Sequence, residues 1–286
     1  MNSIFKYIQN MNRSINNVSL LITEGPYEGQ RALWTNEGFI YQTAPLPLWS
    51  EISSKLQNIS GPTLLQFENH RIFCETLGST PHLIICGCGH VSMAIIALGK
   101  MLGFHVTASD DRPSFCDHAR KNLADEVICN NFEDALKSIP DDANNYFVIV
   151  TRGHRYDMSC LSILLNKPHT YIGMMGSKVR IRNLKQSMIN EGYDQALLDQ
   201  VHMPIGLAIK AETPEEIAVS ILSEIIQIKN ETYATYHYSK EMLLALTNEQ
   251  PDCPYALTTI LQRRGSAPRN AGTKMLVFEN GQTISQ

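Results

Sequence analysis

The clearest hydrophobic pattern in the chain is a short apolar run that ends at two glycines and leads into a helix, within residues 82–111. Residues 83–85 form the apolar run, as expected of a parallel strand that is buried on both faces. Gly87 and Gly89 follow, and a helix is predicted to start near His90. Glycines at this spacing let the backbone turn sharply and approach a ligand, while the helix start directs free N–H groups toward the same space. The pattern therefore predicts a strand, an anion-binding turn and a helix.

The residues after this turn extend the pattern toward a dinucleotide-binding unit. Ser92 occupies the third small position of G-x-G-x-x-G and is small enough for the helix to pack closely on the strand. A second strand is predicted at residues 104–109, and Asp110 and Asp111 follow it, at the distance where a carboxylate receives ribose hydroxyls. The stretch favours a Rossmann unit. The alternative is a glycine turn that only packs the helix.

From residue 83 to about residue 229, predicted strands and helices alternate, which is typical of a doubly wound parallel sheet. Further strands are predicted at 126–129, 146–151 and 169–172, and further helices at 132–139, 158–165 and 178–191. The last helix has an N-cap at Thr213, a proline at Pro214 and a capping-box glutamate at Glu216. We predict an α/β fold, a Rossmann-like doubly wound parallel sheet with strand order 3-2-1-4-5-6, plus a smaller α+β domain.

The two ends of the chain have a different pattern, with short alternating strands and turn residues. Residues 1–80 predict the small α+β domain, with helices at 1–13 and 48–57 and strands at 18–23, 38–42, 63–67 and 71–75. The Rossmann-like domain is predicted at 81–229 and a linker at 230–239. The last segment, 240–286, predicts a helix at 240–247 and strands at 255–261 and 274–278.

Composition narrows the partners and the compartment. The chain has 286 residues, is 43% hydrophobic and carries a net charge of −4 with a pI near 6.1, so no overall charge favours nucleic acid or an anionic membrane. No apolar run is long enough to span a bilayer, and the N-terminus lacks the apolar core of a signal peptide. Seven scattered cysteines argue against a disulfide framework. We expect a cytoplasmic protein without nucleic-acid or membrane partners.

Two loops leave the carboxyl ends of later strands, where ligands bind in such folds. Residues 151–157 carry Arg152, His154 and Asp157. His154 and Asp157 could bind a metal or relay a proton, but one histidine and one carboxylate are few for either role. A polar loop that contacts an anionic ligand is favoured.

The second loop, residues 173–178, holds Gly173 and Gly176, and Ser177 opens another helix. It predicts a second anion site, or else a glycine turn beside a solvated basic face. Near the end of the chain, a basic loop around Arg269 combines glycines with a serine and is either a phosphate cradle or an exposed loop. The residues predicted to bind a cofactor are Gly87, Gly89, His90, Ser92, Asp110, Asp111, Arg152, His154, Gly173, Gly176, Ser177 and Arg269. None is predicted to be catalytic or to hold a metal.

Taken together, these stretches resemble the XdhC/CoxI family, accessory proteins of xanthine dehydrogenase and related molybdenum hydroxylases. The resemblance rests on ICGCGHVS, LGFHVTASDDR, FVIVTRGHRYD, YIGMMGSK and AETPEEIAVSILSEII, in the family's order. It implies a chaperone that binds the molybdenum cofactor (molybdopterin) and helps a cysteine desulfurase to sulfurate it. The cofactor is then inserted into an apo molybdenum hydroxylase, and the chaperone has no turnover of its own.

Two other functions stay open at this point. An NAD(P)-dependent oxidoreductase would use the same glycine turn, with Asp110 favouring an unphosphorylated ribose, although no convincing catalytic acid faces the nicotinamide position. A nucleotide-sensing regulatory module is the third possibility, because the sequence does not rank ligands that share a phosphate.

The segment 240–286 departs from the family order, because the corresponding segment normally begins the family's small domain and precedes a glycine-rich stretch with a cysteine. Residues 1–80 resemble the remainder of that domain. Two isolated strands are marginal in water. We therefore expect the two ends to fold together, either within one chain as a circular permutation or between chains as an exchanged homodimer.

Overall fold

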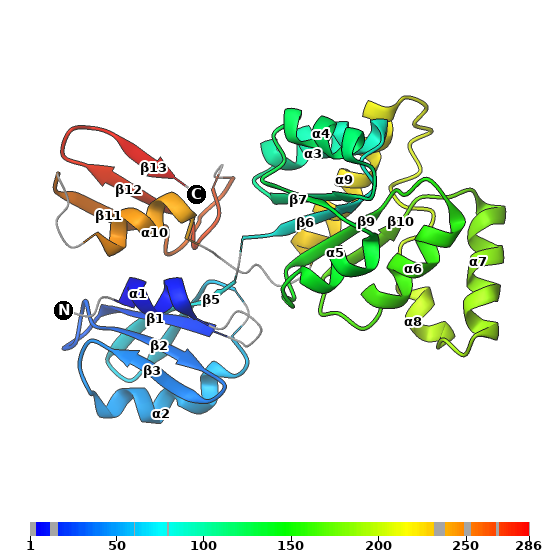
Figure 1. Cartoon of the computed structure of the whole chain (residues 1–286). Helices are drawn as coiled ribbons and strands as arrows, with labels where there is room; N and C mark the ends of the chain where they lie inside the picture. The colour runs from blue at the N-terminus through cyan, green and yellow to red at the C-terminus, as the bar shows by residue number, and fades with distance from the viewer. Residues whose placement is uncertain are drawn as a thin grey trace. The chain divides into compact units, whose positions relative to one another are not determined.

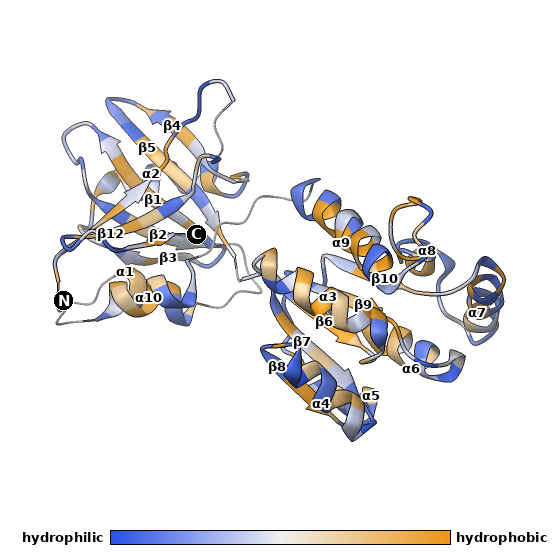
Figure 2. Cartoon of the chain, turned by 90° about the horizontal axis from the view of Figure 1, so that it is seen from above, coloured by the Kyte–Doolittle hydropathy of each residue, from blue (hydrophilic) through white to orange (hydrophobic). Residues whose placement is uncertain are grey.

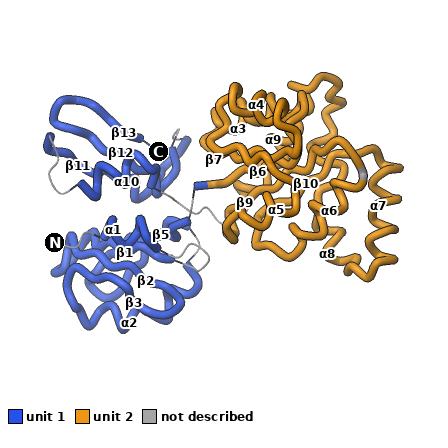
Figure 3. Tube along the Cα trace, viewed as in Figure 1, with its two compact units in different colours: residues 1–80, 233–286 blue, residues 81–232 orange. Residues whose placement is uncertain are grey.

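The computed structural model describes residues 4–11, 17–59, 61–78, 80–231, 238–248, 253–266 and 269–285. It divides into two compact units, which Figure 3 distinguishes by colour. Residues 81–232 form one of them, called here the Rossmann unit. Residues 1–80 and 233–286 form the other, called here the split unit, which therefore draws on both ends of the chain.

The Rossmann unit is built on five parallel strands. They are β6 (His82–Cys86), β7 (His105–Asp110), β8 (Glu126–Cys129), β9 (Asn145–Ile149) and β10 (Tyr171–Met174). Their order in the sheet is β10-β9-β6-β7-β8. The chain moves outward from β6 to β8 and then returns to the other side of β6 for β9. In open α/β sheets, this reversal leaves a crevice at the carboxyl ends of the two central strands, β6 and β9.

Helices cover both faces of this sheet (Figure 1). One face carries α3 (His90–Met101), α4 (Pro113–Lys121) and α9 (Pro214–Glu231). The other carries α5 (Phe132–Ser138), α6 (His154–Leu164), α7 (Lys178–Asn190) and α8 (Gln195–Asp199). Leu83 and Ile85 point to the first face, and Ile84 and Cys86 to the second, so β6 is buried on both sides. The α/β fold class is confirmed.

The sixth strand of the predicted order is not formed in the described part of the chain. The position next to β10 is taken by residues 202–206, which make one isolated parallel bridge between His202 and Gly173. Pro204 has no N–H to donate to a sheet, and Gly206 (φ 91°) turns the chain away toward α9. The predicted order is therefore right for its first five strands and wrong for the sixth.

Two helical segments in this unit differ from the prediction. The helix α4 was not predicted, because only one face of this nine-residue segment is apolar and its remaining residues are mostly polar. The segment 151–157 was predicted as a loop, but α6 already begins at His154. The predicted capping box is confirmed: the Thr213 hydroxyl accepts the Glu216 N–H at 3.2 Å, and the Glu216 carboxylate accepts the Thr213 N–H at 3.1 Å.

The split unit contains an antiparallel sheet with the order β3-β2-β1-β5-β4. Its elements are α1 (Ile4–Asn10), β1 (Asn17–Glu24), β2 (Arg31–Thr35), β3 (Gly38–Gln42), α2 (Pro47–Leu56), β4 (Thr63–Phe67) and β5 (His70–Leu77). The strand β2 was not predicted, although Ala32 and Trp34 face α2 while Leu33 faces the opposite side. The turn-rich residues around this five-residue strand obscured the alternation.

The last segment covers the sheet face that α2 leaves open. It forms α10 (Lys240–Thr247) and a three-stranded sheet of β11 (Tyr255–Thr259), β12 (Lys274–Phe278) and β13 (Thr283–Ser285). Buried side chains from both ends meet there, including Ile4, Leu33, Leu77, Met242 and Leu276. Figure 2 shows the apolar residues of α10 as orange ribbon. No helix in the described part of the chain combines the length and apolar character needed to cross a bilayer.

A buried ion pair joins the two ends of the chain. The Lys274 ammonium donates to the Glu75 carboxylate at 2.6 Å and to the Gly272 carbonyl at 2.9 Å, and it lies 4.9 Å from the ring centre of Tyr238. Lys274 is 1% exposed and Glu75 is 3% exposed. Burial raises the pKa of Glu75 and lowers the pKa of Lys274, and their mutual attraction opposes both shifts. Removing either partner would leave the other charge buried without the opposite charge that now compensates it.

The pair gives a first testable prediction. Glu75→Ala should lower the free energy of unfolding of the split unit by about 3–5 kcal/mol, because it strands the Lys274 charge. The matched control is Glu24→Ala, which removes the carboxylate of the exposed Glu24–Arg71 pair on the same sheet and should cost at most about 1 kcal/mol. Urea unfolding measures both. Equal costs for the two variants would contradict the prediction.

Candidate functional site

The turn between β6 and α3 is shaped by a glycine that no other residue can replace without strain. Gly87 has a φ of 110°, and a Cβ at this position would lie 2.5 Å from the Val150 carbonyl oxygen at the end of β9. The Gly87 N–H donates to the Ser109 carbonyl at 2.7 Å. Ser92 donates its hydroxyl to the Gly87 carbonyl at 2.6 Å, so the serine at the third small position fastens the turn to the helix.

Gly89 differs from Gly87, because its open side faces empty space. No other part of the described chain lies within 4 Å of the position that its Cβ would take, and its φ of −78° suits any residue. Gly89 is the N-cap of α3, and His90 is the first residue of the helix and is exposed. The first N–H groups of a helix have no intrahelical partner and favour an anion. The turn therefore leaves room for a phosphate-sized group beside these donors.

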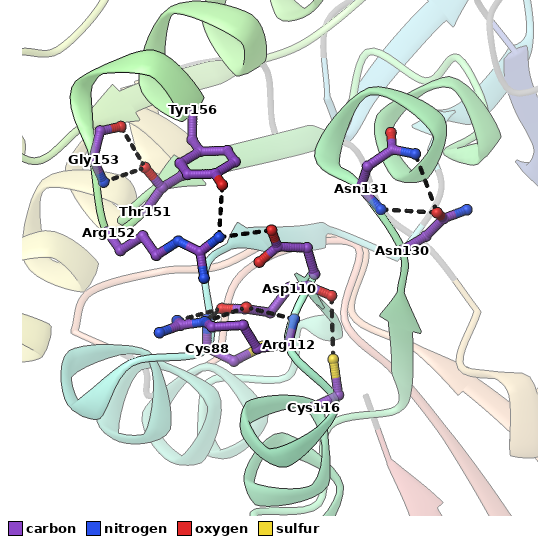
Figure 4. Close-up of polar contacts among 11 residues, drawn as sticks. Cys88, Asp110, Arg112, Cys116, Asn130, Asn131, Thr151, Arg152, Gly153 and Tyr156 are labelled. Carbon is purple, nitrogen blue, oxygen red and sulfur yellow. Dashed lines mark hydrogen bonds and ion pairs between the residues drawn. The ribbon is translucent and has the colours of Figure 1, made fainter.

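Asp110 lies against this turn, at the end of β7 (Figure 4). Its carboxylate accepts the Cys88 N–H at 2.8 Å, the Arg112 N–H at 3.0 Å, and two guanidinium N–H groups of Arg112 at 2.8 and 2.9 Å. Burial alone would raise the pKa of Asp110, but the hydrogen bonds from Arg112 and Cys88 outweigh it and hold this pKa below its ordinary value. Asp110 is 1% exposed and has all its hydrogen bonds within the protein.

Asp111 and Arg152 lie at the same edge of the sheet. The Arg152 guanidinium donates to Asp111 at 2.8 Å and to the Tyr156 hydroxyl at 2.6 Å, and it lies 4.7 Å from the Tyr156 ring centre. The second carboxylate oxygen of Asp111 is buried and has no hydrogen-bond partner among the described residues. The hydrogen bond from Arg152 to Tyr156 and the negative charge of Asp111 raise the pKa of Arg152, so this residue stays cationic.

Asp157 has a structural position in the loop after β9. It lies in the first turn of α6 and is 1% exposed. Its carboxylate accepts a hydrogen bond from the Thr151 hydroxyl at 2.5 Å and forms an ion pair with Arg180 of α7. Thr151 in turn accepts the Gly153 N–H at 3.3 Å. These contacts hold the loop that carries Arg152. The alternative in which His154 and Asp157 bind a metal gains no support, because Asp157 is already engaged by Thr151 and Arg180.

The second glycine loop is less open than the first. Gly173 lies within β10, and a Cβ there would collide with the Tyr171 hydroxyl and the Ile205 side chain, so this glycine serves close packing. Gly176 has Ile181 at 3.3 Å from its would-be Cβ. Ser177 is the N-cap of α7 and accepts the Arg180 N–H at 3.3 Å, so the predicted helix start is confirmed while a ligand role for these residues stays a prediction.

Two predicted residues remain to be placed, His154 and Arg269. His154 is the first residue of α6, after Gly153 as N-cap, so its backbone lies at the crevice. Arg269 belongs to the split unit and is exposed, so its part in a shared site stays a prediction. Among the described residues, no group of three or more His, Cys, Asp and Glu side chains could hold a metal ion.

Cys86 and Cys88, which flank Gly87, are both buried. Burial and the nearby Asp110 charge raise the pKa of Cys88, so its thiol stays protonated. A pocket of about 400 Å³ lies elsewhere, between α6 and α7. It is lined by Arg155, Met158, Ser159, Ser162, Met188, Glu191 and Tyr193 and contains none of the predicted cofactor residues.

Sequence reasoning missed three side-chain contacts that shape this site. Arg112 engages the carboxylate of Asp110, Tyr156 holds Arg152, and Arg180 reaches Asp157 from the next helix. The spacing of Arg112, two residues after Asp110, was a usable signal. The contact between Arg180 and Asp157 joins residues 23 positions apart and has no local signature.

The strand-order reversal, the glycine turn and the acidic end of β7 define a Rossmann-type domain. Residues 83–225, half of the chain, match the XdhC Rossmann domain, and residues 250–286 match the XdhC and CoxI family. The chain belongs to the XdhC and CoxI family, as its motifs predicted.

Two relatives match the chain over part of their own length. Uncharacterized protein YqeB of Escherichia coli (strain K12) is 29% identical over 160 residues, which cover 56% of this chain and 29% of that protein. A probable xanthine dehydrogenase subunit of Bacillus subtilis (strain 168) is 30% identical over 158 residues, which cover 55% of this chain and 46% of that protein. The matched region is thus less than half of either relative.

Two solved structures are weakly similar to this chain. A xanthine dehydrogenase from Bacillus halodurans has a TM-score of 0.48 at 20% identity, covering 80% of this chain and 93% of that one. An imine reductase from Myxococcus stipitatus, in complex with NAD+, has a TM-score of 0.33 at 16% identity, covering 57% of this chain and 56% of that one. Likeness of this degree does not define a shared function.

Substitution by alanine should affect the stability of the protein much more at Gly87 than at Gly89. Gly87→Ala should cost about 1–3 kcal/mol of stability, because of its left-handed φ and the close Val150 carbonyl. Gly89→Ala should change stability by less than about 0.5 kcal/mol, because its Cβ would meet nothing. Urea unfolding of the two variants checks this. A loss of stability for Gly89→Ala as large as that for Gly87→Ala would contradict the open space described beside Gly89.

Asp110 should make stability depend on pH. Its pKa in the folded protein lies below the ordinary value of 3.8, so its contribution is complete above about pH 4 and is lost as the pH falls through the folded-state pKa. Asp110→Asn should therefore lower the free energy of unfolding at pH 7, and the gap to the wild type should narrow below about pH 4. Unfolding measured between pH 7 and pH 3 tests this. A constant gap would show that the carboxylate charge is unimportant.

Proposed function

We propose that this chain is an accessory protein for a xanthine dehydrogenase-type molybdenum hydroxylase, and that its Rossmann unit binds the phosphate-bearing molybdenum cofactor. The observation that carries the proposal is the family match over residues 83–225, which include the whole crevice edge of β6, β7 and β9. One of the relatives of similar sequence is named as a probable component of a xanthine dehydrogenase.

The residues at the crevice fit the phosphate end of such a cofactor. The space beside Gly89 is open, the N–H groups of the first turn of α3 begin there, and Arg152 is a cation with a 39% exposed side chain. When bound, the cofactor supplies the molybdenum centre that a hydroxylase needs. This chain would hold the phosphate with the backbone around Gly89 and His90 and with the Arg152 guanidinium.

The partners belong to the same proposal. Handing over a cofactor requires contact with an apo molybdenum hydroxylase, and sulfuration requires contact with a cysteine desulfurase. We also propose a homodimer in which residues 240–286 exchange between chains. The face that this segment covers within one chain is the face that a second copy would cover in an exchanged pair.

The direct experiment asks which molecule the protein carries. Protein purified from a molybdenum-replete host is denatured, and the released material is assayed for pterin fluorescence, molybdenum, NAD and NADP. Pterin and molybdenum released together support the proposal. Released NAD or NADP without pterin, or oxidation of alcohols at ordinary enzymatic rates, would favour an oxidoreductase instead.

Gly89→Val tests the position of the phosphate. The valine side chain would fill the open space, so the cofactor content of the purified protein should fall at least about tenfold, which corresponds to ~1.4 kcal/mol of binding free energy. The control is Met101→Val. Met101 lies at the far end of the same helix and is 81% exposed, so this variant should retain the cofactor. An unchanged cofactor content in Gly89→Val, with an intact thermal transition, would place the cofactor elsewhere.

A further inference from the structure

The carboxylate that the fold offers to a ribose is not available in this protein. Asp110 ends β7, the position from which a Rossmann domain usually binds ribose hydroxyls, but its oxygens already accept N–H groups from Cys88 and Arg112. Arg112 is equally committed, because it pairs with Asp110 and its guanidinium lies 3.5 Å from the ring centre of Phe115. Neither residue is free to meet a ligand without dismantling the turn.

Asp111, the next residue, makes far fewer hydrogen bonds than Asp110. One carboxylate oxygen accepts a single hydrogen bond from Arg152, and the other is buried without a partner in the described structure. A buried carboxylate oxygen that makes no hydrogen bond is costly, and such atoms in folded proteins usually have a partner. The side chain as a whole is 26% exposed, so a ligand at the crevice can reach it.

The position of the Asp111–Arg152 pair relates it to the glycine turn. Asp111 follows β7 and Arg152 follows β9, and these strands are the two neighbours of β6 in the sheet. The ion pair therefore spans the carboxyl end of β6, where the Gly87 turn and the open side of Gly89 lie. A ligand bound beside Gly89 lies next to both partners of the pair.

We infer that Asp111 binds the 2′,3′-diol of a ribose, and that the crevice takes a nucleoside diphosphate group. The inference rests on the proposed function and narrows it to a dinucleotide form of the cofactor, since a pterin with a single phosphate has no ribose. Once the contact with Arg152 opens, the Asp111 side chain is free to turn toward the crevice, and the diol then donates its two hydroxyl hydrogens to the carboxylate. The Arg152 guanidinium then leaves its ion pair with Asp111 and forms one with the diphosphate.

The energetics allow this exchange. The Asp111–Arg152 pair is partly exposed, and such pairs contribute little net stability, so opening it costs little compared with a diphosphate gained as a partner. The same geometry excludes a phosphate on the 2′ oxygen. That group would lie beside the Asp111 carboxylate, and Arg112, the cation that follows Asp111 in the chain, is already paired with Asp110.

The test is isothermal titration calorimetry of the full chain with CDP and ADP, their 2′-deoxy counterparts, and adenosine 2′,5′-bisphosphate. Wild-type protein should bind each ribose diphosphate at least about tenfold more tightly than its deoxy counterpart, as expected when a hydrogen bond to a charged group is lost. It should reject the bisphosphate. Asp111→Asn should abolish the preference for ribose over deoxyribose while leaving the unfolding transition in place.

The control variant is Asp117→Asn, which removes one negative charge from an exposed pair on α4 and should keep the preference. Equal binding of ribose and deoxyribose diphosphates by the wild type, no binding of either, or a preference retained in Asp111→Asn would overturn the inference. If pterin is still released from the purified protein and is lost in Gly89→Val, the proposed function stands even though the inference about the ribose is overturned. Diol-dependent binding without any released pterin would instead remove the proposed function and leave the ribose site.

Discussion

Asp110 accepts the Cys88 N–H and the Arg112 guanidinium, so the end of β7 is bonded to the glycine turn that follows β6. This contact fixes the crevice from one side. On the other side, Gly87 lies too close to the Val150 carbonyl to carry a side chain, which sets the distance between the turn and β9. The three central strands are thus tied together at their carboxyl ends. The open face of Gly89 and the Asp111–Arg152 pair keep their places because of these constraints.

The contact between Asp110 and Arg112 changes how the two consecutive aspartates, Asp110 and Asp111, are interpreted. A carboxylate at the end of the second strand is the usual ribose ligand of the fold. Here that carboxylate is 1% exposed and belongs to the framework, while one carboxylate oxygen of its neighbour Asp111 is buried without a hydrogen-bond partner among the described residues. In the binding mode that we propose, the ligand-facing role passes to Asp111 because Arg112 occupies Asp110. A pattern of residue types cannot express this shift, since both positions hold aspartate.

The parts of the structure that were predictable from sequence are those with local causes. The apolar run before Gly87 and the cap at Thr213 have short-range signatures, and both are present. The missed elements lack such a signature: β2 has only five residues between turns, and the predicted sixth strand is replaced by a single bridge between His202 and Gly173. The site followed the same division. The glycines were found, while Arg180, which reaches Asp157 from another helix, was not.

The Glu75–Lys274 pair has a consequence for how such a chain changes over generations. The two residues stand 199 positions apart, yet each is the reason that the other is tolerated in an apolar interior. A substitution at one of them is harmful unless the other changes as well, whereas a change of both to well-packed apolar side chains is tolerable. Positions 75 and 274 should therefore vary together. A genetic rearrangement that separates the two segments would also separate charges that depend on each other.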